Sequence, residues 1–147
     1  MKAIQTILFL LVFATANAQM ITGVWKGKVG SGLKASRLEL KLVLKGDSIT
    51  GTSYYHEGPN NYRRYSVKGF FNAETNEVTW WDDVLIEQVV PGFRMLSPNE
   101  IPLLLEADFN CPGGDVMKLD GKAVSKNDQT GKGEVHLDKV AKPLFTD

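Results

Sequence analysis

The 147-residue chain carries 17 basic and 17 acidic residues, so its formal net charge is zero, and 43% of its residues are hydrophobic. This balance offers no basic surface to attract nucleic acid or an anionic membrane, and neither is expected as a partner. The single cysteine, Cys111, excludes an intrachain disulfide, and two histidines are too few for a three-histidine metal site. We expect a domain stabilised by its hydrophobic core, with no cofactor and no metal ion.

A secretory signal peptide is predicted over residues 1–18. Lys2 makes the start basic, the apolar run 7–14 is too short to span a bilayer, and small residues precede an expected cleavage before Gln19. Cleavage would remove Lys2 and no acidic residue, which leaves a net charge near −1. The sequence therefore predicts an exported protein, periplasmic or secreted, with no membrane span after cleavage and a single β-barrel domain over residues 19–147.

Three strands are predicted next, because apolar and polar residues alternate over 21–29, 37–45 and 48–55. The alternation places Trp25 on the inward face of the first strand and Tyr55 on the inward face of the third. Loops or turns are expected at residues 30–36, 46–47 and 56–61.

A hairpin is predicted over residues 62–85, where two runs rich in aromatic and β-branched residues flank the polar break 72–76. If Val67 and Val78 face the interior, alternation carries four further side chains inward: Arg63, Tyr65, Trp80 and Asp82. Thr79, Trp81 and Asp83 are then expected on the outer face or at a rim. Gly69 is a position where a bulge could interrupt this pattern.

The remaining chain predicts three more strands, over 103–109, 116–124 and 133–140. Residues 88–102 contain several prolines and are interpreted as an irregular connection, either a lid or a crossover loop. Cys111 falls in a predicted turn. Since no segment has a helical period, we expect an all-β fold: an antiparallel up-and-down barrel of about eight strands, or alternatively a β-sandwich.

The fragment Gly23-Val24-Trp25 at the start of the first strand resembles the Gly-x-Trp signature of the lipocalins and their calycin relatives. That resemblance implies an antiparallel barrel that holds a small hydrophobic molecule inside. In the lipocalins an arginine near the end of the last strand packs on this tryptophan. No arginine lies in that part of this chain, so the resemblance implies that Lys139 or Lys142 takes its place.

Polar residues on the inward faces point to a binding site, because burying them costs free energy unless they are paired or meet a ligand. An inward guanidinium flanked by tyrosines would bind a ligand carboxylate through two charge-assisted hydrogen bonds, while tryptophans cover the apolar body. The candidate ligand-binding residues are Trp25, Tyr55, Arg63, Tyr65, Trp80 and Asp82. Alternatively, Arg63 pairs with Asp82 across the hairpin and bulky side chains fill the interior.

A second candidate surface consists of aromatic and charged residues expected outside the barrel: Tyr54, His56, Glu57, Tyr62, Arg64, Trp81 and Asp83. These residue types would suit a glycan or an envelope protein. Catalysis has less support, since His136 alternates outward, and two carboxylates, for example Glu57 and Asp82, would serve glycoside hydrolysis only if they faced one cleft. We therefore expect a non-catalytic binding protein for a small lipophilic or amphiphilic ligand.

Overall fold

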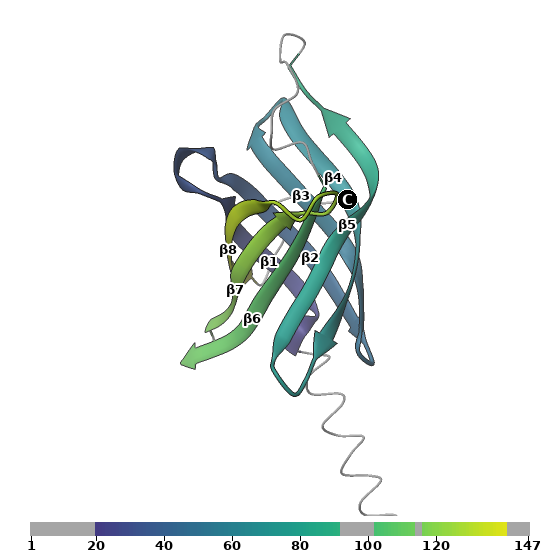
Figure 1. Ribbon diagram of the computed structural model, residues 1–147, viewed down its shortest axis with the longest axis vertical. Coiled ribbons are helices and arrows are strands. Elements are labelled where there is room, and N and C mark those ends of the chain that lie inside the picture. Colours follow the sequence, from purple (N-terminus) through teal and green to yellow (C-terminus); the bar gives the residue numbers. More distant parts are fainter. Residues whose placement is uncertain (1–19, 92–101, 114–115, 141–147) are drawn as a thin grey trace, which may run out of the picture.

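The computed structural model describes residues 20–91, 102–113 and 116–140, and within them the chain forms an antiparallel barrel in which the first and last strands pair (Figure 1). The strands are β1 (Gly23–Gly30), β2 (Ser36–Lys45), β3 (Ser48–Gly58), β4 (Asn61–Asn72), β5 (Glu77–Val89), β6 (Leu103–Gly113), β7 (Val116–Ser125) and β8 (Gly131–Val140), with a short 3₁₀ turn η1 (Gly32–Lys34) after β1. The predicted eight-stranded up-and-down barrel is confirmed, and the β-sandwich is not formed. The expected signal peptide and most of the irregular 88–102 connection lie outside the described residues.

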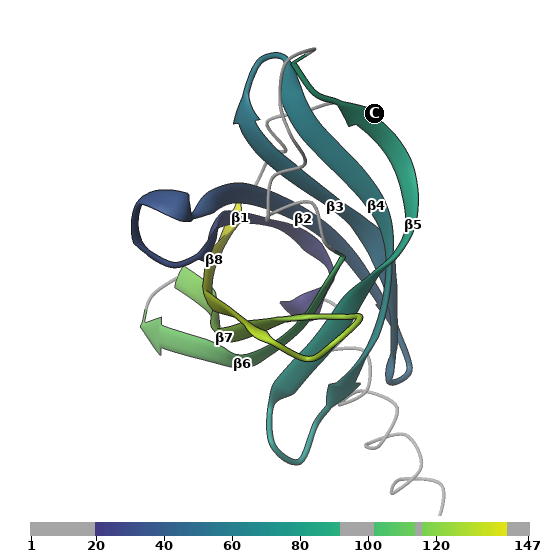
Figure 2. The same ribbon diagram turned by 45° about the horizontal axis from the view of Figure 1, so that its top comes forward.

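Every strand pairs with its neighbours in sequence, and β1 closes the ring by pairing with β8. Trp25 lies opposite Leu40 of β2 on one side and Lys139 of β8 on the other. Figure 2 shows the strands as a ring around a central axis. Closure satisfies the backbone hydrogen bonds that an open sheet would leave exposed at its edges. Among the described residues, no helix has the length and apolar character needed to cross a membrane.

The hydrophobic core is built from the inward faces of all eight strands, as alternation predicts. Its most deeply buried members include Trp25, Leu38, Leu40, Leu42, Ile49, Val67, Val78, Trp80, Leu105, Leu119, Val135 and Leu137. Each such side chain contributes about 1.5–3 kcal/mol relative to remaining exposed. Thr79 was expected outside or at a rim but is only 5% exposed, because its pairing partners Phe70 and Glu106 flank it on the outer face.

Inward-facing glycines mark places where neighbouring strands approach very closely. A Cβ atom added to Gly27 would lie 1.8 Å from the carbonyl oxygen of His136, and one added to Gly69 would lie 2.1 Å from that of Thr79. No side chain fits in such a space. Glycine at these inward positions lets the strands bend sharply enough to close around a small core.

Replacing Gly27 by alanine should lower the free energy of unfolding by about 1–3 kcal/mol, because the new methyl group must displace the β8 backbone. Chemical denaturation measures this loss. Gly58→Ala is the matched control, since nothing lies within 4 Å of a Cβ atom there, and it should change the free energy by less than about 0.5 kcal/mol. Equal losses in the two variants would contradict the close-approach explanation.

At one end of the barrel β3, β4 and β5 extend beyond the other strands (Figure 1). The β5 strand pairs with β6 only over Glu77–Trp81, whereas its pairing with β4 continues to Val89. The register of β4 and β5 shifts between Arg64 and Val67, where three residue steps on β4 face five on β5. Gly69, where a bulge was thought possible, pairs in register with Trp80.

Several strands are longer than the sequence indicated. The predicted 56–61 loop is largely strand, because His56 pairs with Tyr62 and Gly58 with Asn61, which leaves only a tight turn at residues 59–60. Similarly, β6 continues through Cys111 to Gly113 instead of ending at Phe109. Both stretches have a polar, turn-like composition because they form exposed hairpin ends.

Candidate ligand-binding site

Asp82 lies fully buried on the inward face of β5, and its carboxyl group is hydrogen-bonded from several sides. The Ser53 hydroxyl donates to Oδ1 over 2.7 Å, and the Leu103 backbone N–H donates to Oδ2 over 2.9 Å. The Tyr55 hydroxyl lies 3.1 Å from Oδ1 and 2.9 Å from Oδ2. Lys126 Nζ donates to the backbone carbonyl of Asp82 over 2.9 Å. Asp82 therefore links β3 and β5 to the start of β6 and to the turn after β7.

Arg63 lies on the inward face of β4 and is 7% exposed. Its Nη1 atom is buried and has no hydrogen-bond partner among the described residues. The hydrogen bonds to the Asp82 carboxyl group come from Ser53, Tyr55 and Leu103 instead. Among the described residues Arg63 and Asp82 thus form no hydrogen bond or ion pair; such a pair was one part of the alternative to a ligand site. The other part was an interior filled by bulky side chains, and Trp25 and Trp80 are indeed fully buried there.

The electrostatics of the site follow from its burial. Burial raises the pKa of the Asp82 carboxyl group, while its hydrogen bonds from Ser53, Leu103 and Tyr55 and the charge of Arg63 oppose that rise. Burial, together with Asp82, raises the pKa of Tyr55 well above its ordinary value, so this hydroxyl stays protonated and can donate. Arg63 is therefore near enough to influence Asp82 without being bonded to it.

The two tyrosines predicted for the site are adjacent. Their rings meet edge to face, with centroids 6.1 Å apart and an interplanar angle of 80°. Tyr55 lies opposite Arg63 in the β3–β4 ladder, and Ser53 lies opposite Tyr65. The pairing of β3 with β4 thus brings Tyr55, Arg63 and Tyr65 together. Sequence reasoning did not single out Ser53, although its inward position beside Tyr55 was the available signal.

The two buried tryptophans of the predicted site differ in their contacts. Trp25 Nε1 donates to the carbonyl oxygen of Ile21 over 3.0 Å, and Phe109 meets the ring edge to face at 6.1 Å. Trp80 is fully buried, yet its Nε1 atom has no hydrogen-bond partner in the described part of the chain. The indole N–H of Trp80 is thus buried without an acceptor, whereas the indole N–H of Trp25 has one.

Lys139 packs on Trp25 as the lipocalin resemblance implied for Lys139 or Lys142. Its Nζ atom lies 5.7 Å from the centre of the Trp25 ring and also donates to the carbonyl oxygen of Met20 over 2.6 Å. A cation at this distance from an indole face is attracted to the ring. Lys142 lies outside the described residues.

The outer candidate surface is only partly assembled. Tyr54 and Tyr62 stack with ring centroids 5.2 Å apart, and His56 lies 5.6 Å from Tyr54. In contrast, Trp81 of β5 lies opposite Lys68 of β4, six residues along that strand from Tyr62. There Lys68 forms an ion pair with Asp83 over 2.8 Å. The larger aromatic surface expected from the sequence is therefore divided into two parts.

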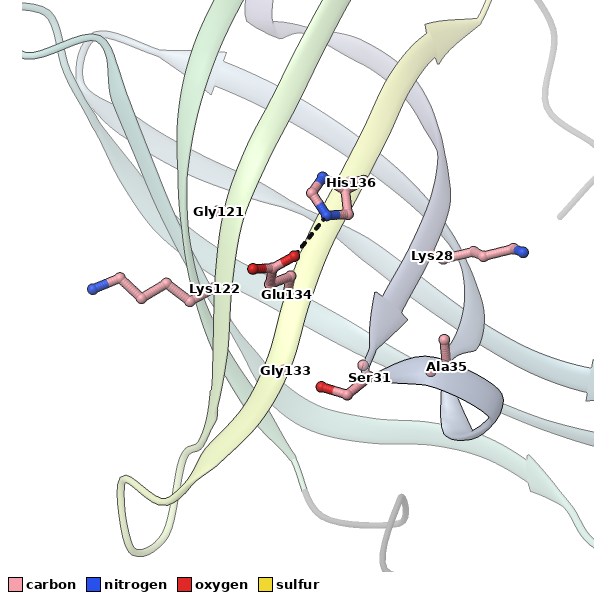
Figure 3. A pocket seen from close by; sticks show the side chains of 10 residues that line it. Lys28, Ser31, Ala35, Gly121, Lys122, Gly133, Glu134 and His136 are labelled. Atoms are coloured by element: carbon pink, nitrogen blue, oxygen red, sulfur yellow. Dashed lines mark hydrogen bonds and ion pairs between the residues drawn. The ribbon is translucent and has the colours of Figure 1, made fainter.

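A hollow on the outside of the barrel lies over β1, β7 and β8 (Figure 3). Lys28 and Lys122 line it together with Glu134 and His136, which lie near each other on β8. His136 Nδ1 is 2.8 Å from Asp120 Oδ1, and Nε2 is 3.2 Å from Glu134 Oε2. Hydrogen bonds to these two carboxylates raise the pKa of the imidazole. Charged side chains of both signs line this hollow together with several glycines and Ala35.

The raised pKa of His136 predicts a pH-dependent contribution to stability. Because the pKa in the folded protein exceeds the unfolded value of about 6.5, the stabilisation is fully present below that pH and is lost as the pH rises through the folded pKa. The free energy of unfolding of the wild type minus that of His136→Gln should therefore be larger at about pH 5 than at about pH 9 in urea titrations. A difference that grows with pH would contradict this interpretation.

No family model, curated protein or solved structure matches this chain. The closed, antiparallel, eight-stranded barrel has the architecture expected of a lipocalin-like small barrel. Within the described ranges, no group of three or more His, Cys, Asp or Glu side chains is placed to hold a metal ion. Around Arg63, the structure brings together a buried guanidinium atom without a hydrogen-bond partner and the rings of Tyr55 and Tyr65.

Proposed function

We propose that this protein is a non-catalytic binding protein that holds a small lipophilic or amphiphilic molecule inside its barrel, with an anionic group of the ligand at Arg63. The observation that carries the proposal is the buried Nη1 atom of Arg63, which has no acceptor among the described residues. An unsatisfied buried donor costs about 1–3 kcal/mol, and more if it is charged. A ligand carboxylate would recover this cost through charge-assisted hydrogen bonds.

The surroundings of Arg63 suit such a ligand. The inward faces of the strands are mostly apolar. Some eight-stranded barrels hold one small ligand inside, while others are filled by side chains. Tyr65 and Trp80 would contact the apolar part of the ligand, and Trp25 would close the barrel beyond it. Tyr55 is hydrogen-bonded to Asp82, so in this proposal both act by fixing the wall beside Arg63.

We also propose that the protein works after export, in a periplasm or outside the cell. This part of the proposal rests on the predicted signal peptide at residues 1–18.

Native mass spectrometry of the protein purified gently from its own host tests the proposal. We expect a reproducible extra mass that is released on denaturation and that proves to be an amphiphilic acid. A bare protein mass, together with no binding of added amphiphilic acids, would overturn the proposal.

A second candidate function is recognition of a glycan or an envelope protein through the outer aromatic residues. The stacked pair Tyr54 and Tyr62 with nearby His56 supports it. This alternative predicts that Tyr62→Ala abolishes binding while a change at Arg63 does not. The barrel-interior proposal predicts the opposite, so one pair of variants distinguishes the two functions.

A further inference from the structure

The hollow on the outside of the barrel takes no part in the proposed interior site or in the outer aromatic surface (Figure 3). It lies where β1 ends: the β1–β8 ladder runs as far as Gly30 opposite Glu134, and the chain then leaves the ladder to form η1. A Cβ atom added to Gly133 would lie 2.5 Å from the Ser31 hydroxyl oxygen, so only glycine allows this close approach. The hollow measures about 890 Å³, which is within the range of small-molecule sites.

The lining of the hollow has little side-chain bulk at its centre. Four of its ten residues are glycines and a fifth is an alanine, namely Gly30, Gly32, Gly121, Gly133 and Ala35. Main-chain CH groups therefore form much of the lining, and a small ring can rest against them. A sugar ring offers such a CH face together with a rim of hydroxyl groups.

Two lysines flank the hollow, Lys28 from β1 and Lys122 from β7, on opposite sides in Figure 3. Neither ammonium group has a hydrogen bond or ion pair with another described residue. Because β8 lies between β1 and β7, the two backbones are roughly 10 Å apart. Both side chains extend away from the centre, but a lysine stem is flexible and turns readily toward an anion. The pair therefore suits a ligand that carries two negative charges some distance apart.

Between the two lysines the hollow presents a carboxylate, that of Glu134. His136 Nε2 lies 3.2 Å from Glu134 Oε2, and Asp120 holds the other side of the imidazole at 2.8 Å. These contacts fix the carboxylate and leave Oε1 without a partner among the described residues. A carboxylate only accepts hydrogen bonds, so the middle of the ligand must donate and must not be charged negatively. A hydroxyl group meets both requirements.

We propose that this hollow binds an acidic oligosaccharide, in which carboxylates on separate sugars meet Lys28 and Lys122 while a hydroxyl group between them donates to Glu134. The CH face of a sugar ring would lie on the glycines. The site is separate from the barrel interior and goes beyond the proposed function, so neither depends on the other. An acidic peptide is the competing class, because it supplies the same charges without the sugar hydroxyls.

Calorimetry at low salt tests the proposal with protein expressed from the full 147-residue sequence and processed by its host. The probes are tetragalacturonic acid, its methyl ester, and tetraglutamate, which carries as many side-chain carboxylates. Tetragalacturonic acid should bind most tightly. The methyl ester should bind roughly two- to thirtyfold more weakly, which corresponds to the loss of two exposed ion pairs. Tetraglutamate should also bind more weakly, because it brings no hydroxyl group to Glu134.

Two pairs of substitutions locate the binding. Lys28→Gln combined with Lys122→Gln should weaken tetragalacturonic acid by the same two- to thirtyfold. The matched control combines Lys26→Gln with Lys118→Gln, which removes the same charge from the same two strands but lies outside the hollow. It should leave the affinity nearly unchanged. Glu134→Ala should lower the ratio of the affinities for tetragalacturonic acid and tetraglutamate about two- to tenfold, since only the sugar loses a hydrogen bond.

A second measurement needs no variant. The chain has two histidines, His56 and His136, so their imidazole signals are easily separated by NMR. Tetragalacturonic acid should move the signals of His136 and leave those of His56 in place. Movement of His56 alone would place the sugar at the outer aromatic residues and overturn the proposal.

The remaining outcomes are equally decisive. If tetragalacturonic acid does not bind, or binds no more tightly than tetraglutamate, the hollow is not a site for acidic sugars. Equal losses in the two lysine pairs would mean that overall charge, and not the hollow, attracts the ligand. None of these results bears on the ligand proposed for the barrel interior, which the hexadecanoic acid titrations test separately.

Discussion

Replacing Asp82 by alanine should lower the free energy of unfolding by about 3–5 kcal/mol, the largest stability loss expected from one substitution in the site. The change removes the acceptor of three buried or partly buried donors: the Ser53 hydroxyl, the Tyr55 hydroxyl and the Leu103 amide. Each stranded donor costs about 1–3 kcal/mol. Chemical denaturation measures the total loss. Hydrogen exchange at the Leu103 amide reports whether the start of β6 has loosened.

Asp83→Ala is the matched control, because Asp83 is the next residue and faces the surface. Its carboxylate forms an ion pair with Lys68 over 2.8 Å, and the Lys68 side chain is 61% exposed. Such pairs contribute about 0–1 kcal/mol, so this variant should be nearly as stable as the wild type. Similar losses at residues 82 and 83 would show that the buried hydrogen bonds are not what makes Asp82 important.

The barrel could be predicted from the sequence because its strands alternate so regularly. The inward positions of Arg63, Tyr65, Trp80 and Asp82 all follow from period-two alternation, and the shift between β4 and β5 falls where it does not disturb them. The register shift itself left no clear mark in the sequence. Strand ends were harder to predict, since the polar residues around His56 suit a loop and an exposed hairpin end equally well.

The partners of each buried group could not be predicted, because they depend on distances across strands. Alternation placed Arg63 and Asp82 in one interior, and opposite charge made their pairing a reasonable alternative. Only the pairing of β3 with β4, and the return of the chain at Leu103, shows that Asp82 is bonded elsewhere. The contrast between Trp25 and Trp80 has the same origin, because the partner of Trp25 is a backbone carbonyl that leaves no trace in the sequence.

Replacing Arg63 by methionine should separate stability from binding. Methionine keeps much of the volume and removes a buried charge whose Nη1 atom has no acceptor among the described residues, so the free energy of unfolding should stay constant or rise by up to about 2 kcal/mol. The affinity for an amphiphilic acid should fall roughly thirtyfold or more, because removing the charged partner of a buried head group costs about 2–5 kcal/mol. Thermal denaturation and calorimetric titration with hexadecanoic acid measure the two effects.

Arg64→Met provides the comparison for Arg63→Met, since the neighbouring arginine alternates to the outer face and lies 3.7 Å from Glu87 in a partly exposed ion pair. It should change neither stability nor affinity by more than about 0.5 kcal/mol. A marked loss of stability in Arg63→Met would mean that Arg63 has a structural partner within the protein. Unchanged affinity in that variant would place the ligand elsewhere. A stable Arg63→Met protein that no longer binds the acid, beside an unaffected Arg64→Met protein, is the result that a ligand-binding arginine requires.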